Sequence, residues 1–171
     1  MLDEPNRLDD PNRYVLTHTM LRIKDPKRSL EFYQKVLGMS LISWLDFDEG
    51  GFTLFFLQPG GNADGAAPSL AEVFSRPGLL ELTHNWGTEQ DDEPMHSGNE
   101  EPKGYGHICI AVPDIEAACA RFDRLGVTFQ KELGHGGMKD IAFIKDPDGY
   151  WIEIVQPSLM DAMLAKYRTA S

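Results

Sequence analysis

The chain has 171 residues, of which 42% are hydrophobic and 25% are charged, a balance typical of a globular protein and not of a disordered one. Its formal net charge of -11 argues against a nucleic-acid partner, and an anionic ligand must therefore bind where arginine or lysine residues gather. The sequence has neither an apolar run near the ~20 residues of a membrane span nor the pattern of a secretory signal, so we expect a cytoplasmic protein without a membrane partner.

The two cysteines, Cys109 and Cys119, both lie in apolar stretches. Two are too few for a disulfide framework. We therefore expect both thiols to be reduced and buried.

A tandem repeat organises the chain. In each copy a histidine opens a short apolar run that reaches an aspartate, Asp25 or Asp114, seven residues later. An amphipathic helical pattern ending in Leu-Gly follows, and each copy closes on an apolar strand that carries one glutamate. The residues at equivalent places are His18 and Glu81 in the first copy and His107 and Glu153 in the second.

The first copy contains four expected strands and one helix. We expect strands over 14–24, 39–45, 52–57 and 79–86, and a helix that Asp25 caps, Pro26 begins and Gly38 stops. Alternation places Arg22 on the face of His18, and Asn85 on the face of Glu81. The segment from Pro59 to Gly78, rich in Gly, Ala, Pro and Ser, has no counterpart in the second copy and is interpreted as an insertion.

The second copy repeats this order. Strands are expected over 107–112, 127–131, 140–145 and 150–156, with a helix that Asp114 caps. Each copy thus reads β-α-β-β-β, which predicts an α+β fold of two tandem βαβββ modules with curved antiparallel-type sheets. The predicted organisation is an arm at 1–13, a first module at 14–87 with its insertion at about 59–78, a linker at 88–103, a second module at 104–156 and a tail at 157–171 with a short helical pattern.

The four repeat-related residues form a candidate metal site. Taken alone, each would be interpreted as a strand-end histidine or a solvent-facing glutamate, but the repeat relates all four. Glu153 shares a strand face with Trp151 and Val155, and a carboxylate among apolar side chains is costly unless it is paired or bound to a metal. Two imidazoles and two carboxylates suit a divalent ion such as zinc, nickel, cobalt or iron. The lack of thiolate ligands favours a catalytic over a structural zinc site.

Several long motifs resemble the glyoxalase I (lactoylglutathione lyase) family of the vicinal-oxygen-chelate superfamily. They include Leu-Glu-Leu-Thr-His-Asn-Trp-Gly at 80–87 and Asp-Pro-Asp-Gly-Tyr-Trp-Ile-Glu at 146–153, with further stretches at 18–22, 29–33, 36–39 and 104–108. The resemblance covers residues 14 to 156. It implies isomerisation of the hemithioacetal of methylglyoxal and glutathione to S-lactoylglutathione, through an enediolate held by a divalent metal.

The resemblance also implies roles for single residues. His18, Glu81, His107 and Glu153 would be the metal ligands, with Glu153 as the base that moves the proton and Glu81 as its partner. Zinc is the first expectation for the metal, since the arm and the insertion resemble zinc-activated members, and nickel and cobalt remain open.

The glutathione contacts come from the same comparison. Arg22 and Asn85 fall on positions that hold the γ-glutamyl end, Lys131 and Gly136 on positions that hold the glycyl carboxylate, and Met138 on a pocket wall. Lys103 replaces an arginine of the long forms, and so keeps the charge but loses the bidentate fork.

The resemblance further implies a homodimer with barrel-like metal sites, each pairing a first module with the partner's second module. Two other classes stay open at this point. One is an extradiol dioxygenase of the same superfamily, with Fe(II) on two histidines and one glutamate. The other is a metal-free small-molecule binding protein of the same fold.

Overall fold

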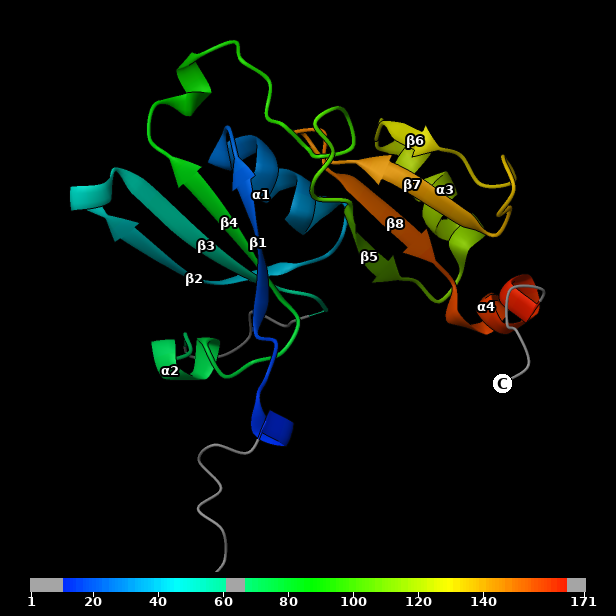
Figure 1. Ribbon diagram of the computed structural model, residues 1–171, viewed down its shortest axis with the longest axis horizontal. Coiled ribbons are helices and arrows are strands. Elements are labelled where there is room, and N and C mark those ends of the chain that lie inside the picture. Colours follow the sequence, from blue (N-terminus) through cyan, green and yellow to red (C-terminus); the bar gives the residue numbers. More distant parts are fainter. Residues whose placement is uncertain (1–10, 61–66, 166–171) are drawn as a thin grey trace, which may run out of the picture. The chain divides into compact units, whose positions relative to one another are not determined.

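The computed structural model describes residues 11–60 and 67–165, so most of the predicted arm and the end of the tail lie outside the described residues. The chain forms two compact units (Figure 1). Unit 1 holds the described part of Met1–Arg22 together with Gly38–Trp86. Unit 2 holds Ile23–Leu37 together with the described part of Gly87–Ser171. The first helix therefore groups with the second half of the chain.

Unit 1 is built on a four-stranded sheet with the strand order β1-β4-β3-β2 (Figure 1). The strands are β1 (His18–Ile23), β2 (Ser40–Phe47), β3 (Phe52–Gln58) and β4 (Leu79–Asn85). Strand β1 starts later than the predicted 14–24, since Tyr14, Val15 and Leu16 are exposed to solvent. Short 3₁₀ turns lie at Pro11–Arg13 and Asp48–Gly50.

The insertion contributes a helix to unit 1. Helix α2 (Leu70–Val73) begins with a capping box, in which the Ser69 hydroxyl accepts from the Glu72 N–H and the Glu72 carboxylate accepts from Ser69. Val73 is buried and packs in a core cluster with Phe56 and Leu79. Partly buried Ile42, Leu45 and Leu54 complete this cluster. The insertion is therefore in part a structured element of the core.

Unit 2 is built on a second four-stranded sheet with the strand order β5-β8-β7-β6 (Figure 1). Its strands are β5 (His107–Ala111), β6 (Phe129–Lys131), β7 (Ile141–Lys145) and β8 (Trp151–Val155). Its helices are α1 (Pro26–Lys35), α3 (Ile115–Arg124) and α4 (Pro157–Leu164), and a 3₁₀ turn lies at Thr88–Gln90. One face of the sheet is buried in the hydrophobic core, where Ile144, Ile152 and Ile154 are each 0% exposed.

The predicted α+β fold with two strand-rich modules is confirmed, with one correction. Strands β5 and β8 are parallel, so this sheet is mixed and not antiparallel throughout. The reason is the connection: β8 follows β7 through a short turn and pairs with it antiparallel, while the chain between β5 and β8 passes through α3, β6 and β7, so that β8 lies beside β5 and runs in the same direction.

Both predicted helix starts are confirmed. The Asp25 carboxylate accepts from the N–H groups of Lys27 and Arg28 at 2.8 and 3.3 Å, and Asp114 accepts from Ala117 at 2.9 Å. Gly38, predicted to stop the first helix, has a φ of 68°, a left-handed conformation that favours glycine.

Hydrogen bonds fasten α1 to the turn between β7 and β8. The Tyr33 hydroxyl donates to Asp146 at 2.8 Å, and the Ser29 hydroxyl donates to Asp148 at 3.1 Å. Burial raises the pKa of Asp146 to about 6, although Tyr33 and two backbone N–H groups stabilise its charged form. These bonds explain why α1 belongs to unit 2.

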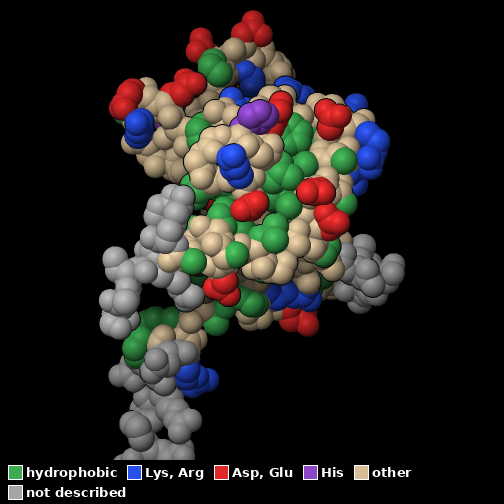
Figure 2. All heavy atoms as spheres, turned by 90° about the vertical axis from the view of Figure 1, so that its right-hand side faces the viewer, with side chains coloured by type: hydrophobic (Ala, Val, Ile, Leu, Met, Phe, Trp, Pro, Cys, Tyr) green, Lys and Arg blue, Asp and Glu red, His purple; other side chains and the backbone are tan. Residues whose placement is uncertain are grey.

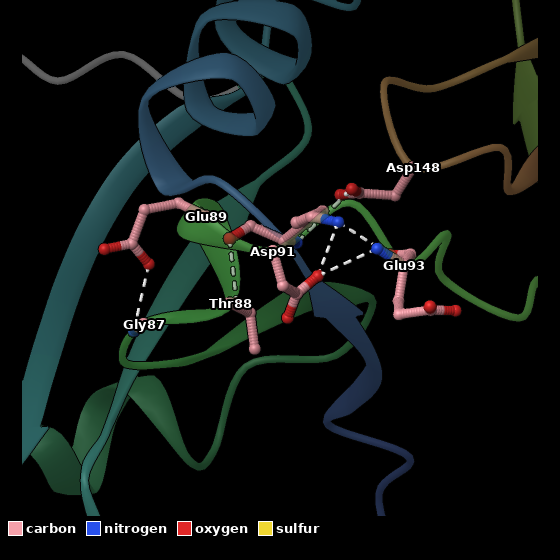
Figure 3. A network of polar contacts seen from close by, with 7 residues as sticks. Gly87, Thr88, Glu89, Asp91, Glu93 and Asp148 are labelled. Atoms are coloured by element: carbon pink, nitrogen blue, oxygen red, sulfur yellow. Dashed lines mark hydrogen bonds and ion pairs between the residues drawn. The ribbon is translucent and has the colours of Figure 1, made fainter.

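Lys24 adds a second set of contacts just before α1 (Figure 3). Its ammonium lies 2.7 Å from the Asp91 carboxylate and donates to the Glu93 carbonyl at 2.6 Å. Its backbone N–H donates to Asp148 at 3.3 Å, and its carbonyl accepts from the Thr88 hydroxyl at 2.9 Å. The chain after β1 and the acidic loop after β4 are thereby held together within unit 2.

Among the described residues, no helix is both long and apolar enough to cross a membrane. On the face drawn in Figure 2, acidic and basic side chains are interspersed with apolar ones and do not gather by sign. That face therefore has no patch of a single charge sign among the described residues.

Candidate metal centre

Unit 1 brings the first predicted ligand pair together. His18 begins β1 and Glu81 lies on the neighbouring β4, and Nε2 of His18 is 3.2 Å from Oε2 of Glu81. The two side chains are 24% and 10% exposed. The Thr83 hydroxyl donates to Oε1 of Glu81 at 3.1 Å, so that one carboxylate oxygen is held while the other faces the histidine.

The surroundings of His18 fix its ring. Nδ1 of His18 lies 2.9 Å from the Thr17 hydroxyl, and an Nδ1–H donating to that oxygen leaves the Nε2 lone pair free for a metal. The rings of Phe56 and Phe74 contact the imidazole edge-on, each with a centroid distance of 5.8 Å. Phe74 follows α2 in the insertion, and sequence reasoning missed it. The Ser69-to-Glu72 capping box was the signal that a helix stood there.

Unit 2 brings the second predicted pair together. Nε2 of His107 on β5 lies 3.3 Å from Oε2 of Glu153 on β8, and the side chains are 40% and 21% exposed. In the strand register, His107 pairs with Trp151 and Cys109 pairs with Glu153. The Phe143 ring contacts His107 edge-on with a centroid distance of 5.2 Å.

The cysteine prediction needs a correction. Both thiols are free, as expected, but Cys109 is exposed and Cys119 is only partly buried. Alternation places Cys109 on the open sheet face with His107, not on the core face. Partial desolvation of the sulfur, followed by the charge and hydrogen bonding of Glu153, raises the pKa of Cys109 to about 11, so the thiol stays protonated.

The donor set fits a divalent metal. Two ligands bound to one ion at about 2.0 to 2.2 Å lie roughly 2.9 to 3.5 Å apart in tetrahedral or octahedral geometry. The observed imidazole-to-carboxylate distances of 3.2 and 3.3 Å fall in that range. Each pair therefore has the spacing of two neighbouring ligands. Over 11–60 and 67–165, His, Cys, Asp and Glu side chains do not form groups of three or more that could hold a metal ion.

The structure places the predicted substrate contacts in two groups. Arg22 and Asn85 are exposed, near the ends of β1 and β4 in unit 1. Lys103 is 73% exposed in unit 2, with its ammonium 3.8 Å from Glu101.

The other three predicted contacts lie together. The Lys131 ammonium donates to the carbonyls of Met138 and Ile141 at 2.7 and 2.6 Å, and a Cβ on Gly136 would lie 3.4 Å from the Lys131 side chain. Partial burial lowers the pKa of Lys131. Lys131, Gly136 and Met138 thus form one cluster beside β6.

Comparison with known proteins places this fold and site in a class. The model of the glyoxalase/bleomycin resistance protein/dioxygenase superfamily matches residues 15–154, and the chain belongs to that superfamily. Within it, the chain is a member of the glyoxalase I (lactoylglutathione lyase) family, as the sequence motifs predict.

Three relatives carry this assignment. A lactoylglutathione lyase of Pseudomonas aeruginosa is 56% identical over 153 residues, covering 88% of this chain and 86% of that protein. A lactoylglutathione lyase of Schizosaccharomyces pombe is 48% identical over 147 residues, covering 85% of this chain and 46% of that protein. The solved structure of the trypanothione-dependent glyoxalase I of Leishmania major is 31% identical with a TM-score of 0.65, covering 92% of this chain and 99% of that one.

Proposed function

We propose that this protein isomerises the hemithioacetal of methylglyoxal and glutathione to S-lactoylglutathione at a divalent metal. The observation that carries the proposal is the pair of His–Glu contacts at equivalent places of the repeat, with donor distances of 3.2 and 3.3 Å. The names of the relatives, lactoylglutathione lyase and glyoxalase I, support the reaction.

His18, Glu81, His107 and Glu153 would hold the metal. A divalent ion at this place supplies Lewis-acid stabilisation of the negative charge that develops on the substrate oxygens. We propose zinc as that ion, with nickel and cobalt as alternatives. The support for zinc is the sequence resemblance of the N-terminal arm and of the Pro59 to Gly78 insertion to zinc-activated members of the family.

Glu153 is the proposed base. A proton next to a carbonyl leaves only with help from a positioned acceptor, and a carboxylate within reach of both carbons can take it from C1 and return it to C2. Glu153 is more exposed than Glu81, at 21% against 10%. Glu81 also has one oxygen occupied by Thr83. These differences favour Glu153 for proton transfer and Glu81 as its partner.

The glutathione part of the substrate carries carboxylates, so its binding to this acidic protein requires local positive or hydrogen-bonding side chains. Arg22 and Asn85 are the proposed contacts of the γ-glutamyl end, and Lys103, in place of the arginine of the long forms, is a further proposed substrate contact. Lys131 and Gly136 are proposed for the glycyl carboxylate, with Met138 as a wall. The Lys131 ammonium has three N–H groups and donates two to carbonyls, which leaves one for a ligand.

We further propose a homodimer in which each site takes His18 and Glu81 from one chain and His107 and Glu153 from the other. Each unit supplies only one pair, and a catalytic metal needs three or more protein ligands. The test mixes Glu81→Ala and Glu153→Ala variants under conditions that exchange subunits. Cross-chain sites place both lesions in one site of the heterodimer, so activity returns, whereas absence of recovery despite proven exchange would contradict the dimer proposal.

The reaction itself is tested by reconstitution. Apo protein is loaded with zinc, nickel, cobalt or magnesium and assayed for S-lactoylglutathione formation. We expect activity with zinc. Activity with nickel alone would contradict the metal assignment. Inactivity with every metal, together with Fe(II)-dependent oxygenation of a catechol, would assign the protein to dioxygenase chemistry.

A further inference from the structure

We infer that Lys145 binds the zwitterionic α-amino-acid end of the thiol cosubstrate, in a cavity of unit 2 beside the His107 pair. The inference deepens the proposed function and rests on it. It starts from a cavity of about 450 Å³ between the loop at 94–100 and the ends of strands β6 to β8. Its lining includes His96, Glu100, Lys145, Asp148 and Trp151.

Lys145 is a half-buried cation without a protein partner within the described residues. The other part-buried lysines of unit 2 have acceptors within the protein. Lys24 contacts Asp91 and Glu93, and Lys131 donates to two carbonyls. A half-buried lysine that lines a cavity and has no protein acceptor can form a charge-assisted contact with an anion that enters the cavity.

The strand register puts Lys145 on the face of the proposed metal site. Lys145 pairs with Trp151 on β8, and Trp151 pairs with His107 on β5. Alternation places these three side chains on the sheet face that also carries Glu153. Two strand spacings separate Lys145 from His107 by roughly 10 Å, about the length of an extended tripeptide. A tripeptide thiol at His107 therefore reaches Lys145.

The charged residues around the cavity indicate which end of glutathione binds there. The Lys145 ammonium offers a contact for a carboxylate, while the acidic residues Glu100 and Asp148 line the same cavity and favour an ammonium. Glu100 is the freer of the two, because the Asp148 carboxylate also accepts from the Ser29 hydroxyl and the Lys24 backbone N–H. The γ-glutamyl end of glutathione carries both an α-carboxylate and an α-ammonium, whereas the glycyl end carries only a carboxylate. The mixed charges therefore favour the γ-glutamyl end.

The loop wall of the cavity is already formed. Gly98 has a φ of 85°, and a Cβ there would lie 2.3 Å from the Tyr105 carbonyl oxygen. The Gly104 N–H donates to the Gly98 carbonyl at 2.9 Å, and the His96 ring contacts the Pro102 carbonyl at 2.9 Å. Lys103, a proposed substrate contact, follows the loop at 94–100 by three residues in the chain.

The test compares Lys145→Met with Lys145→Arg, and with Lys27→Met as a matched control on exposed α1. We expect Lys145→Met to raise KM for the glutathione hemithioacetal about tenfold, the size of one charge-assisted contact, with kcat within about twofold. Lys145→Arg should restore KM to within about threefold, and Lys27→Met should leave it unchanged. An unchanged KM in Lys145→Met would overturn the inference.

A second measurement identifies the ligand end that Lys145 contacts by varying the ligand. S-methylglutathione, its γ-glutamyl α-carboxamide and its glycyl carboxamide are titrated against wild-type protein and against Lys145→Met. The wild type should lose about tenfold in affinity for the α-carboxamide, and the variant should not distinguish it from the parent compound. A Lys145-dependent loss with the glycyl carboxamide alone would overturn the inference. An inactive wild type that still shows this Lys145-dependent pattern would contradict the proposed reaction and support the cavity.

Discussion

The two His–Glu pairs have nearly the same donor distance but different surroundings. In unit 1, His18 is held by two aromatic rings and a threonine, and the Glu81 side chain is 10% exposed. In unit 2, His107 has one aromatic neighbour in Phe143 and is 40% exposed. The insertion makes part of this difference, because Phe74 comes from it and the second copy has no such segment.

The difference between the two pairs suits them to different tasks, one to holding a metal ion and the other to transferring a proton. A pair held by packing and a second hydrogen bond is suited to holding an ion, since its geometry is set before binding. A more open pair keeps room for a substrate and for a carboxylate that exchanges a proton.

The largest expected effect is on the open pair. Glu153→Gln keeps an oxygen that can bind a metal but removes the proton acceptor, so kcat should fall about 10²- to 10⁴-fold. Steady-state kinetics with metal analysis measures this. The matched control is Glu116→Gln on exposed α3, which should retain wild-type kcat. A Glu153→Gln enzyme within tenfold of wild type, with metal bound, would transfer the base role to Glu81.

The strands that carry the two glutamates also begin differently, and this predicts a pH effect. In unit 1 the insertion precedes β4, whereas in unit 2 the buried Asp146 carboxylate lies in the turn before β8. Burial raises the pKa of Asp146 from 3.8 to about 6, so the folded state favours its neutral form. The stability gained from that neutral form is present at low pH and is lost as the pH rises from about 4 through 6, by about 3 kcal/mol.

Asp146→Asn should remove that pH dependence. The amide oxygen can accept from the N–H groups of Asp148 and Tyr150, and the amide nitrogen can donate to the Tyr33 hydroxyl. Denaturant unfolding at pH 4.5 and pH 8 should show the variant gaining stability relative to wild type at the higher pH. Asp123→Asn on exposed α3 serves as control, and parallel curves for Asp146→Asn and wild type would refute the burial effect.

The smallest expected effect is on the held pair. Thr83→Val removes the hydroxyl that donates to Glu81 while keeping its shape, so metal affinity should fall about tenfold. Cys109→Ala removes the thiol that hydrogen-bonds Glu153 in unit 2, and because a thiol is a weaker donor than a hydroxyl, metal affinity should change less than threefold. Competition with a chelator measures both. Equal losses in the two variants would remove the distinction between the pairs.

Local sequence signals predicted much of the fold. The capping aspartates Asp25 and Asp114 and the alternation around Glu153 gave helix starts and strand faces, because these depend on residues close in the chain. The repeat also predicted that each His would meet its Glu. The pairing of all four ligands across two chains stays a prediction.

Other features depend on contacts between distant residues and were not predictable in this way. The amphipathic pattern of α1 does not indicate which of the two units the helix joins. The hydrogen bond from Tyr33 to Asp146 fixes α1 in unit 2. The exposed face of Cys109 and the parallel pairing of β5 with β8 likewise depend on where β8 enters the sheet. The capping box of Ser69 and Glu72 indicates the start of α2 in the sequence. The Gly, Ala, Pro and Ser content of the insertion nevertheless favoured a loop, so α2 was not predicted.

The close approach at Gly98 has a thermodynamic consequence for ligand binding. Backbone order in a loop costs roughly 1 to 2 kcal/mol of conformational entropy per residue whenever the order is acquired. Here the loop is closed on Tyr105 by the fold itself, so that loss belongs to folding and not to association. We therefore expect ligand association on this side of the cavity to be limited by diffusion and charge, without a slow loop-ordering phase.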